Sequence, residues 1–202
     1  MYLEILVEQP SAEAALRALV PKILGTDISF DIHAHQGKSD LLSALPGRLR
    51  GYKHWIPDDY KIVVLIDEDR SDCKELKKQL ERTARDAGLI TKTKSKGSAF
   101  QVLNRIAVEE LEAWFSGDIP ALTKAYPGVP RSLNKKSPYR NSDAIKGGTW
   151  EALERVLQRA GYYQGGLPKI EAAKKISGHM DPTKNRSKSF QVFRDGLLRL
   201  SI

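Results

Sequence analysis

The sequence predicts an α/β protein with a mostly parallel sheet flanked by helices, followed by a basic helical extension. Short apolar runs alternate with amphipathic helical patterns through the first 118 residues, as in repeated strand–helix units. One run, residues 61–66, is almost continuously apolar, as in a strand that is buried on both faces. From residue 119 the composition shifts to basic loops and helices. We therefore expect an α/β domain over residues 1–118 and a basic helical extension over residues 119–202, packed on it.

The individual elements follow from the spacing of apolar residues. Strands are expected at residues 2–7, 28–33, 61–66 and 100–108, with a further short strand at 89–90. Helices are expected at residues 12–24, 41–49, 72–87, 109–118, 149–160, 167–180 and around 190–198. Pro21 lies inside the first helical pattern and predicts a kink or an end near that residue.

Composition narrows the class of protein. No run approaches 18 apolar residues, and the amino terminus enters a strand pattern at once. We therefore expect a cytoplasmic protein that does not span a membrane. The single cysteine, Cys73, excludes an intrachain disulfide, and neighbouring carboxylates make it a partly buried helix residue in our interpretation, not a nucleophile.

The charge is unevenly distributed along the chain. Residues 1–110 contain 17 lysines and arginines and 17 aspartates and glutamates, whereas residues 111–202 contain 16 and 8, so the second part supplies the net charge of +8. Such a surface can bind nucleic acid, because neutralised phosphates release counterions. It can also be a solvated surface that keeps the protein in solution.

Acidic residues follow three predicted strands. Glu8 follows the first, Asp67 and Asp69 follow the strand at 61–66, and Glu110 follows the strand at 100–108. Parallel strands end at one edge of a sheet, where ligands usually bind, so these carboxylates would converge. Hard divalent cations would offset their mutual repulsion, which implies Mg²⁺ or Mn²⁺. The alternative is that each acid only begins the next helix, where the helix dipole favours it.

Other signals are weaker. Gly37 and Lys38 precede a helix and could hold a phosphate. His33 and His35 could ligate a metal, but we interpret them as polar surface residues at a strand end. The candidate nucleic-acid contacts are basic residues in loops and helix ends, namely Lys38, Lys92, Lys94, Lys96, Lys135, Lys136, Arg140, Lys184, Arg186 and Lys188. A solvated surface explains the same residues.

The order of acids resembles a known family. A strand followed by Glu8, and later a strand followed by Asp67-Glu68-Asp69, resembles the Toprim domain of topoisomerases, primases and related nucleases. Segment 109–115 (EELEAWF) is similar to one in small bacterial Toprim proteins related to the overcoming-lysogenisation-defect nucleases of phage-defence loci. That closer resemblance extends through segments 168–173 (PKIEAA) and 187–190 (SKSF).

The resemblance implies a Rossmann-like Toprim fold and a metal-dependent hydrolase that cleaves nucleic acid. Glu8, Asp67 and Asp69 would be catalytic and would bind Mg²⁺ or Mn²⁺, and Glu110 and Glu112 would complete a second metal position. Two ions could activate water and stabilise the leaving oxygen. The family context also implies an ATPase partner, and a homodimer is left open.

The sequence departs from the family pattern in two places. Gln9 stands where a glycine is usual, and Glu13 lies five positions after Glu8 where four are usual. Lys96 is a candidate catalytic lysine only through its nearness to the last strand. Two rival hypotheses stay open. One is a D-x-D phosphohydrolase with Asp67 as nucleophile, and the other is a catalytically weak subunit that mainly docks an ATPase.

Overall fold

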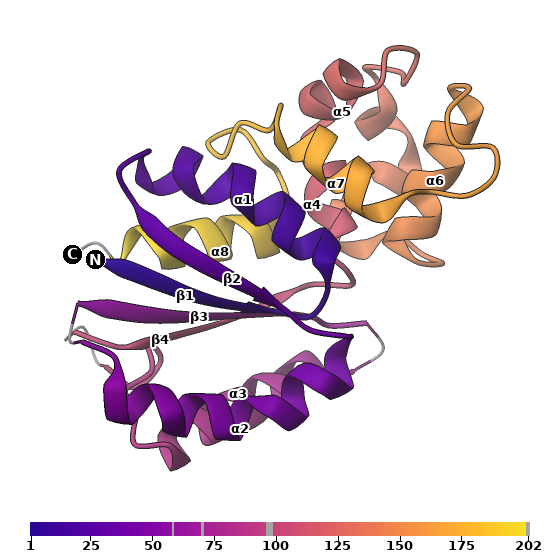
Figure 1. Ribbon diagram of the computed structural model, residues 1–202. Coiled ribbons are helices and arrows are strands. Elements are labelled where there is room, and N and C mark those ends of the chain that lie inside the picture. Colours follow the sequence, from indigo (N-terminus) through magenta and orange to yellow (C-terminus); the bar gives the residue numbers. More distant parts are fainter. Residues whose placement is uncertain (58, 70, 96–98, 201–202) are drawn as a thin grey trace.

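The computed structural model describes residues 1–57, 59–69, 71–95 and 99–200. Its strands are β1 (Tyr2–Val7), β2 (Ser29–Ala34), β3 (Tyr60–Asp67) and β4 (Val102–Ala107). They form one sheet in the order β2-β1-β3-β4, and every pairing is parallel (Figure 1). The prediction of an α/β fold with a parallel sheet is confirmed, in a Rossmann-like arrangement.

Helices cover both faces of the sheet. Helices α1 (Pro10–Leu24) and α8 (Lys188–Leu198) lie on one face, and α2 (Lys38–Trp55) and α3 (Cys73–Asp86) lie on the other (Figure 1). Alternate strand residues supply the two cores, because successive side chains point to opposite faces. Val63 and Leu65 pack with α1 and α8, whereas Val64 and Ile66 pack with α2 and α3. Burial on both faces explains why β3 is apolar along nearly its whole length.

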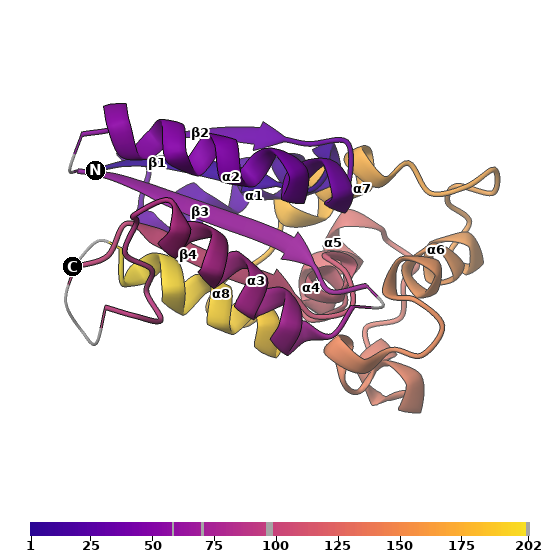
Figure 2. The ribbon, with the colours of Figure 1, turned by 90° about the horizontal axis from the view of Figure 1, so that it is seen from below.

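The remaining helices gather beyond the ends of the strands (Figures 1 and 2). They are α4 (Glu112–Ser116), α5 (Ile119–Ala125), α6 (Thr149–Arg159) and α7 (Lys169–Ser177). Three short 3₁₀ helices, Leu133–Lys135, Ser137–Tyr139 and Ser142–Ala144, connect α5 to α6. These elements share one continuous hydrophobic core with α1, α8 and one face of the sheet. The boundary at residue 118 therefore crosses a common core, and the division into two domains stays a prediction.

Local chemistry explains where several helices begin and end. The Asp72 side chain accepts hydrogen bonds from the first backbone N–H groups of α3, and the Ser187 hydroxyl does the same for α8. Gly25 closes α1 with a φ of 96°, and its N–H donates to the Pro21 carbonyl. The helix thus continues to Leu24, three residues past Pro21. Among the described residues, no helix is long and apolar enough to cross a membrane.

Helix α5 was not expected, α7 is shorter than the expected 167–180, and three further elements differ from their predictions. Helix α2 runs from Lys38 to Trp55 and is longer than the expected 41–49. The expected strand at 89–90 is absent: Leu89 is buried in the core beside α3, and the neighbouring Thr91 makes one isolated bridge to Val102. Helix α4 begins at Glu112 because Glu109 has a φ of 60°, which a right-handed helix does not allow.

Trp114 joins the helical part to the sheet. Its ring is fully buried and packs against Phe190 and Phe193. Its indole N–H donates to the Ser189 hydroxyl at 2.8 Å, and its carbonyl accepts from the Asn185 amide at 2.8 Å. The beginning of α8 is therefore held against α4 by side-chain bonds as well as by packing.

We predict that Gly117→Ala lowers the free energy of unfolding by about 1–3 kcal/mol, the usual range for overpacking. A methyl group there would lie 2.9 Å from the backbone nitrogen of Ser187 and would also collide with the Asn185 amide oxygen. Urea unfolding measures the change. Gly47→Ala is the matched control, since it meets no atom within 4 Å and lies in α2, where alanine should stabilise by about 0.5–1 kcal/mol. Equal effects would contradict the close packing at Gly117.

Candidate functional site

The ends of β1 and β3 carry buried carboxylates at one edge of the sheet, which we call the carboxyl edge. Glu8 directly follows β1 and is 8% exposed, and Asp67 ends β3 and is 5% exposed. The Asp67 N–H donates to Glu8 Oε2 at 3.2 Å, so the two strand ends are directly joined. The Gln9 amide donates to Asp67 Oδ2 at 3.3 Å. The residue that departs from the family pattern is thus in contact with the central acid.

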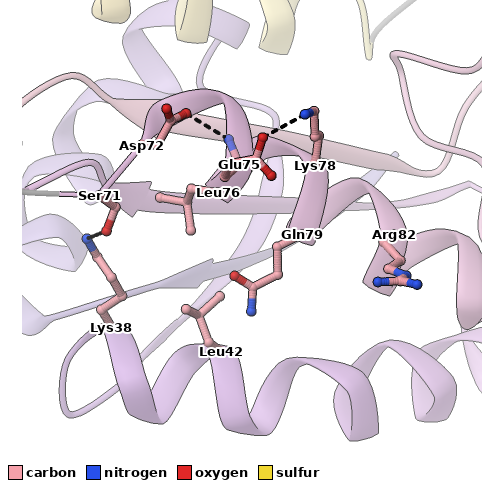
Figure 3. A pocket seen from close by; sticks show the side chains of 9 residues that line it. All are labelled: Lys38, Leu42, Ser71, Asp72, Glu75, Leu76, Lys78, Gln79 and Arg82. Atoms are coloured by element: carbon pink, nitrogen blue, oxygen red, sulfur yellow. Dashed lines mark hydrogen bonds and ion pairs between the residues drawn. The ribbon is translucent and has the colours of Figure 1, made fainter.

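Asp69 lies farther out, where it is paired with a lysine from α2. Its side chain is 43% exposed, and Lys38 Nζ is 2.7 Å from Asp69 Oδ2. The same ammonium donates to the Glu68 carbonyl at 2.9 Å and to the Ser71 hydroxyl at 3.4 Å. Figure 3 shows Lys38 directed at Ser71. Both residues line a hollow of about 530 Å³ between α2 and α3. Lys38 therefore holds the loop after β3 in place, and phosphate binding by Gly37 and Lys38 stays a prediction.

The loops after β3 and β4 are bonded to each other through unusual backbone conformations. Asp69 and Glu109 have φ values of 49° and 60°, which are uncommon for residues other than glycine. The Asp69 N–H donates to the Glu109 carbonyl at 2.7 Å, and the Glu109 N–H donates to Glu68 Oε2 at 3.1 Å. These bonds bring Glu110 and Glu112 beside the acids that follow β3.

Glu110 caps a helix that is distant in the sequence. Its Oε2 accepts hydrogen bonds from the Thr149 N–H at 3.0 Å, the Thr149 hydroxyl at 2.8 Å and the Trp150 N–H at 2.9 Å. These groups belong to the first turn of α6, where backbone N–H groups lack partners within the helix. Glu110 thus has a structural role, and its other carboxylate oxygen makes none of these bonds.

Glu112 is the most deeply buried acid of the group. It is 2% exposed, and its Oε2 has no hydrogen-bond partner among the described residues. Lys169 Nζ lies 4.0 Å from its other oxygen and also sits 4.5 Å above the Trp150 ring. Burial raises the pKa of Glu112 to about 7, against the lowering effect of Lys169. Glu151, in the first turn of α6, adds a smaller raising effect.

The acids influence one another across the carboxyl edge. Burial raises the pKa of Asp67 well above its usual range, and the charges of Glu112 and Glu8 raise it further. Burial also raises the pKa of Glu8, against the lowering effect of the Asp67 N–H. Both shifts favour the protonated carboxyl groups, and perturbed pKa values of this kind are common at functional sites.

The oxygen-rich donor set has the chemistry that Mg²⁺ and Mn²⁺ prefer, and the unpartnered Glu112 oxygen fits this role. Even so, the part of the chain that the structure describes contains no group of three or more His, Cys, Asp or Glu side chains that could hold a metal ion. The metal site expected at this edge therefore stays a prediction.

The structure brings together five predicted acids, Glu8, Asp67, Asp69, Glu110 and Glu112, at or near the carboxyl edge. Glu13, whose spacing from Glu8 departs from the family pattern, pairs with Arg17 on α1 at 2.7 Å. Cys73 is partly buried at the start of α3, as expected, and burial followed by the charge of Glu68 raises the pKa of its thiol.

The predicted basic contacts separate into three places. Lys92 and Lys94 precede β4, so they lie at the opposite edge of the sheet from the acids. Lys96 lies outside the described residues. The other candidates, apart from Lys38, belong to the helical part of the chain, namely Lys135, Lys136, Arg140, Lys184, Arg186 and Lys188.

One expectation about histidines is wrong. His35 is buried, with its Nδ1 3.0 Å from Asp40 Oδ2, and it is not a surface residue. His33 is half-buried, and its Nε2 lies 2.6 Å from Glu4. His33 contacts Glu4 on the adjacent strand β1, and His35 contacts Asp40 in the first turn of α2, so both rings have acidic partners.

Sequence reasoning missed Lys169 and Glu151. Each lies on a helix remote from the strands, and Lys169 is 57 positions from Glu112, so no local spacing links them. The local signal was a basic residue directly after Pro168, in the first turn of the predicted helix 167–180 and at the first position of α7.

The fold and the site define an α/β protein whose buried acids gather where parallel strands end, the usual position of ligand sites in open sheets. The chain belongs to the family described as "Domain of unknown function (DUF4276)", whose model matches residues 7–198. Comparisons with curated proteins and with solved structures give no match.

We expect Glu110→Ala to lower the free energy of unfolding by about 2 kcal/mol, because the first turn of α6 loses a charged acceptor. Glu110→Gln is the control, since its amide oxygen can still accept and its cost should be smaller. Urea unfolding of both variants measures the difference. Equal losses for alanine and glutamine would contradict the capping role.

The raised pKa of Glu112 predicts a pH-dependent stability. Between pH 4.5 and about 7 the folded chain keeps a proton on Glu112 that the unfolded chain releases. The contribution of this proton to the free energy of unfolding is present in full below pH 4.5 and is lost as the pH rises to 7. It is on the order of 3 kcal/mol.

Thermal unfolding with a chelator present, from pH 5 to 8, measures this contribution. Glu112→Gln imitates the protonated acid, so the variant should match the wild type at pH 5 and unfold at a higher temperature at pH 8. Parallel pH profiles for the two proteins would show that Glu112 does not hold this proton.

Proposed function

We propose that the chain is a Mg²⁺- or Mn²⁺-dependent nuclease that hydrolyses phosphodiester bonds. The observation that supports this most is the group of acids from distant segments at the carboxyl edge, of which Glu112 is buried with an unpartnered oxygen. Burying carboxylates beside one another is unfavourable unless a proton or a cation compensates. A site built this way suits a ligand that carries positive charge.

In this proposal Glu8, Asp67, Asp69, Glu110 and Glu112 supply oxygen ligands to the metal. A bound divalent cation would polarise the phosphate and lower the pKa of water. Because Glu110 Oε2 is committed to α6, only its other oxygen would be available. Glu8 and Asp67, whose pKa values are raised, can accept or release a proton at the carboxyl edge.

Two cations flank these acids and suit an anionic substrate. Lys38 is held near Asp69, and Lys169 is held near Glu112 by the Trp150 ring. Their ammonium groups would position phosphate oxygens on either side of the acids. The basic helical part, with its excess of lysine and arginine, would bind the rest of the nucleic acid.

The wider setting rests on the Toprim resemblance. We propose a cytoplasmic effector of an ATPase-linked phage-defence system, with an ATPase as partner. A homodimer is compatible with this setting.

A second candidate function is a catalytically weak subunit that mainly docks an ATPase. It is favoured by the contacts that already occupy two of the acids: Lys38 pairs with Asp69, and the Gln9 amide donates to Asp67. It is also favoured by the finding that the described residues hold no group of three potential metal ligands.

We predict that the wild type cleaves plasmid DNA, single-stranded DNA or tRNA with Mn²⁺ or Mg²⁺ and is inactive with EDTA. Asp67→Asn and Glu8→Gln should each lower the rate by more than about 100-fold, since loss of only the outer-shell partners of metal ligands already costs 10–100-fold. Gel assays of the initial cleavage rate measure this effect. Glu13→Gln is the matched control, because Glu13 pairs with Arg17 on α1 and lies outside the site.

The outcomes separate the hypotheses. Cleavage that survives both site substitutions would refute the assignment of the acids. Absence of cleavage with a partner ATPase present would favour the docking subunit. Asp67-dependent hydrolysis of a phosphomonoester, without cleavage of nucleic acid, would favour the phosphohydrolase.

A further inference from the structure

The helical part of the chain has two adjoining hollows lined by basic side chains. The larger, of about 700 Å³, is lined by five cations, Lys136, Arg140, Lys146, Arg155 and Arg159. The smaller, of about 400 Å³, adds Lys184, Arg186 and Lys188. Both are lined by Tyr139, Arg140 and Asn141, so they adjoin at these residues, and we call the two hollows together the basic groove.

Most of these cations lack acidic partners. Among the described residues, an ion pair is found only for Lys184, with Asp181 at 2.9 Å. Two aspartates lie close to these cations: Asp118 lines the smaller hollow, and Asp143 is bonded to the segment that carries Arg186 and Lys188. Asp118 accepts from the Ala121 N–H at 3.1 Å, and Asp143 accepts from the Ser187 hydroxyl at 2.6 Å. The groove therefore presents a high density of exposed positive charge.

The charged residues that line the basic groove differ from those that line the hollow in Figure 3. There, Lys78 pairs with Glu75 at 2.6 Å, and Asp72 also lines the space. Mixed charges of this kind are those of an ordinary solvated surface. Five cations without an acid in one lining, as in the larger basic hollow, are a sharper signal for a polyanion.

One wall of the groove is fixed by hydrogen bonds. The Asp143 carboxylate accepts from the Lys188 N–H at 2.5 Å as well as from Ser187, and the Arg186 N–H donates to the Gly117 carbonyl at 2.9 Å. The backbone that carries Arg186 and Lys188 is therefore held before any ligand arrives. Preorganisation of this kind lowers the entropic cost of binding.

Two helices join the groove to the acidic site. Helix α4 begins at Glu112 and ends beside Gly117, which lines the smaller hollow. Helix α6 begins at its Glu110 cap and carries Arg155 and Arg159 into the larger hollow. At 1.5 Å per residue, Arg159 lies about 15 Å along α6 from the capped first turn, roughly four base steps of a duplex. One nucleic-acid segment could therefore occupy the groove and reach the acids.

We propose that the basic groove binds the phosphodiester backbone of nucleic acid and directs it toward the carboxyl edge. This inference deepens the proposed nuclease function and rests on it. Arginine suits this role because its guanidinium can hold a phosphate through two hydrogen bonds. The additional residues assigned to binding are Lys146, Arg155 and Arg159.

Binding can be measured apart from cleavage, by fluorescence anisotropy with EDTA present. The probes are labelled 20-nucleotide single-stranded DNA, single-stranded RNA and duplex DNA. Two double variants test the two hollows, Arg155→Gln with Arg159→Gln and Lys184→Gln with Arg186→Gln. Each should weaken binding at least about tenfold and reduce the slope of log affinity against log salt by about two, one for each lost phosphate contact.

The matched control is Lys78→Gln with Arg82→Gln, which removes two charges from the hollow of Figure 3. It should leave the affinity unchanged, and thermal unfolding should show that all variants are folded. Wild-type affinity in both groove variants, an equal loss in the control, or no binding of any probe by the wild type would overturn the proposal. Displacement of nucleic acid by polyglutamate of equal charge would instead indicate an acidic protein partner.

These experiments give different results depending on whether the groove proposal or the nuclease proposal is wrong. Groove variants that bind weakly, together with an Asp67→Asn variant that binds normally and does not cut, support both proposals. If the wild type cleaves nucleic acid and the groove variants bind it normally, the groove proposal is rejected and the nuclease proposal is kept. Groove-dependent binding without any cleavage would support the groove and reject the nuclease.

Discussion

The organising constraint of this structure is the parallel direction of its strands. Because all four run the same way, the segments that follow β1, β3 and β4 meet at a single edge. Those segments carry the acids, and their backbone groups must find partners there. The loops after β3 and β4 bond to each other, and Glu110 bonds to the first turn of α6. One carboxylate thereby attaches the helical part of the chain to the sheet.

Several charges at the carboxyl edge are offset by neighbouring groups of opposite polarity. Lys38 offsets Asp69, Lys169 lies near Glu112, and the positive end of α6 faces Glu110. Asp67, in the middle, has only the neutral amide of Gln9 as a side-chain donor in the described structure. Its raised pKa follows from that position, with desolvation first and the neighbouring charges second.

The sequence was sufficient to predict the sheet and the convergence of the acids. Strands buried on both faces, such as β3, have an apolar pattern that few other elements share, and their predicted bounds lie within one or two residues of the observed ones. Strand ends then locate Glu8 and Asp67 by topology alone. The parts that escaped prediction depend on tertiary contacts. The left-handed conformation of Glu109 displaces the start of α4, and the partners of Lys38 and Lys169 come from elements distant in the chain.

The basic groove illustrates the same limit. Composition indicated an excess of positive charge after residue 110, but it could not show which cations share a surface. The 3₁₀ helices between α5 and α6 bring Lys136 and Arg140 beside α6 and the segment before α8. Arg155 and Arg159 also lie on the helix that Glu110 caps, and their spacing of four residues places them on one side of it.

The left-handed backbone of Asp69 and Glu109 has an evolutionary consequence. A non-glycine residue in this conformation costs about 1–2 kcal/mol, so a glycine at either position would stabilise the fold if shape alone mattered. Laboratory selection for heat resistance should therefore favour changes at these loops early. A variant with glycine at position 69 would keep the sheet and lose one carboxylate of the proposed site, so at Asp69 stability and site chemistry would be selected in opposite directions.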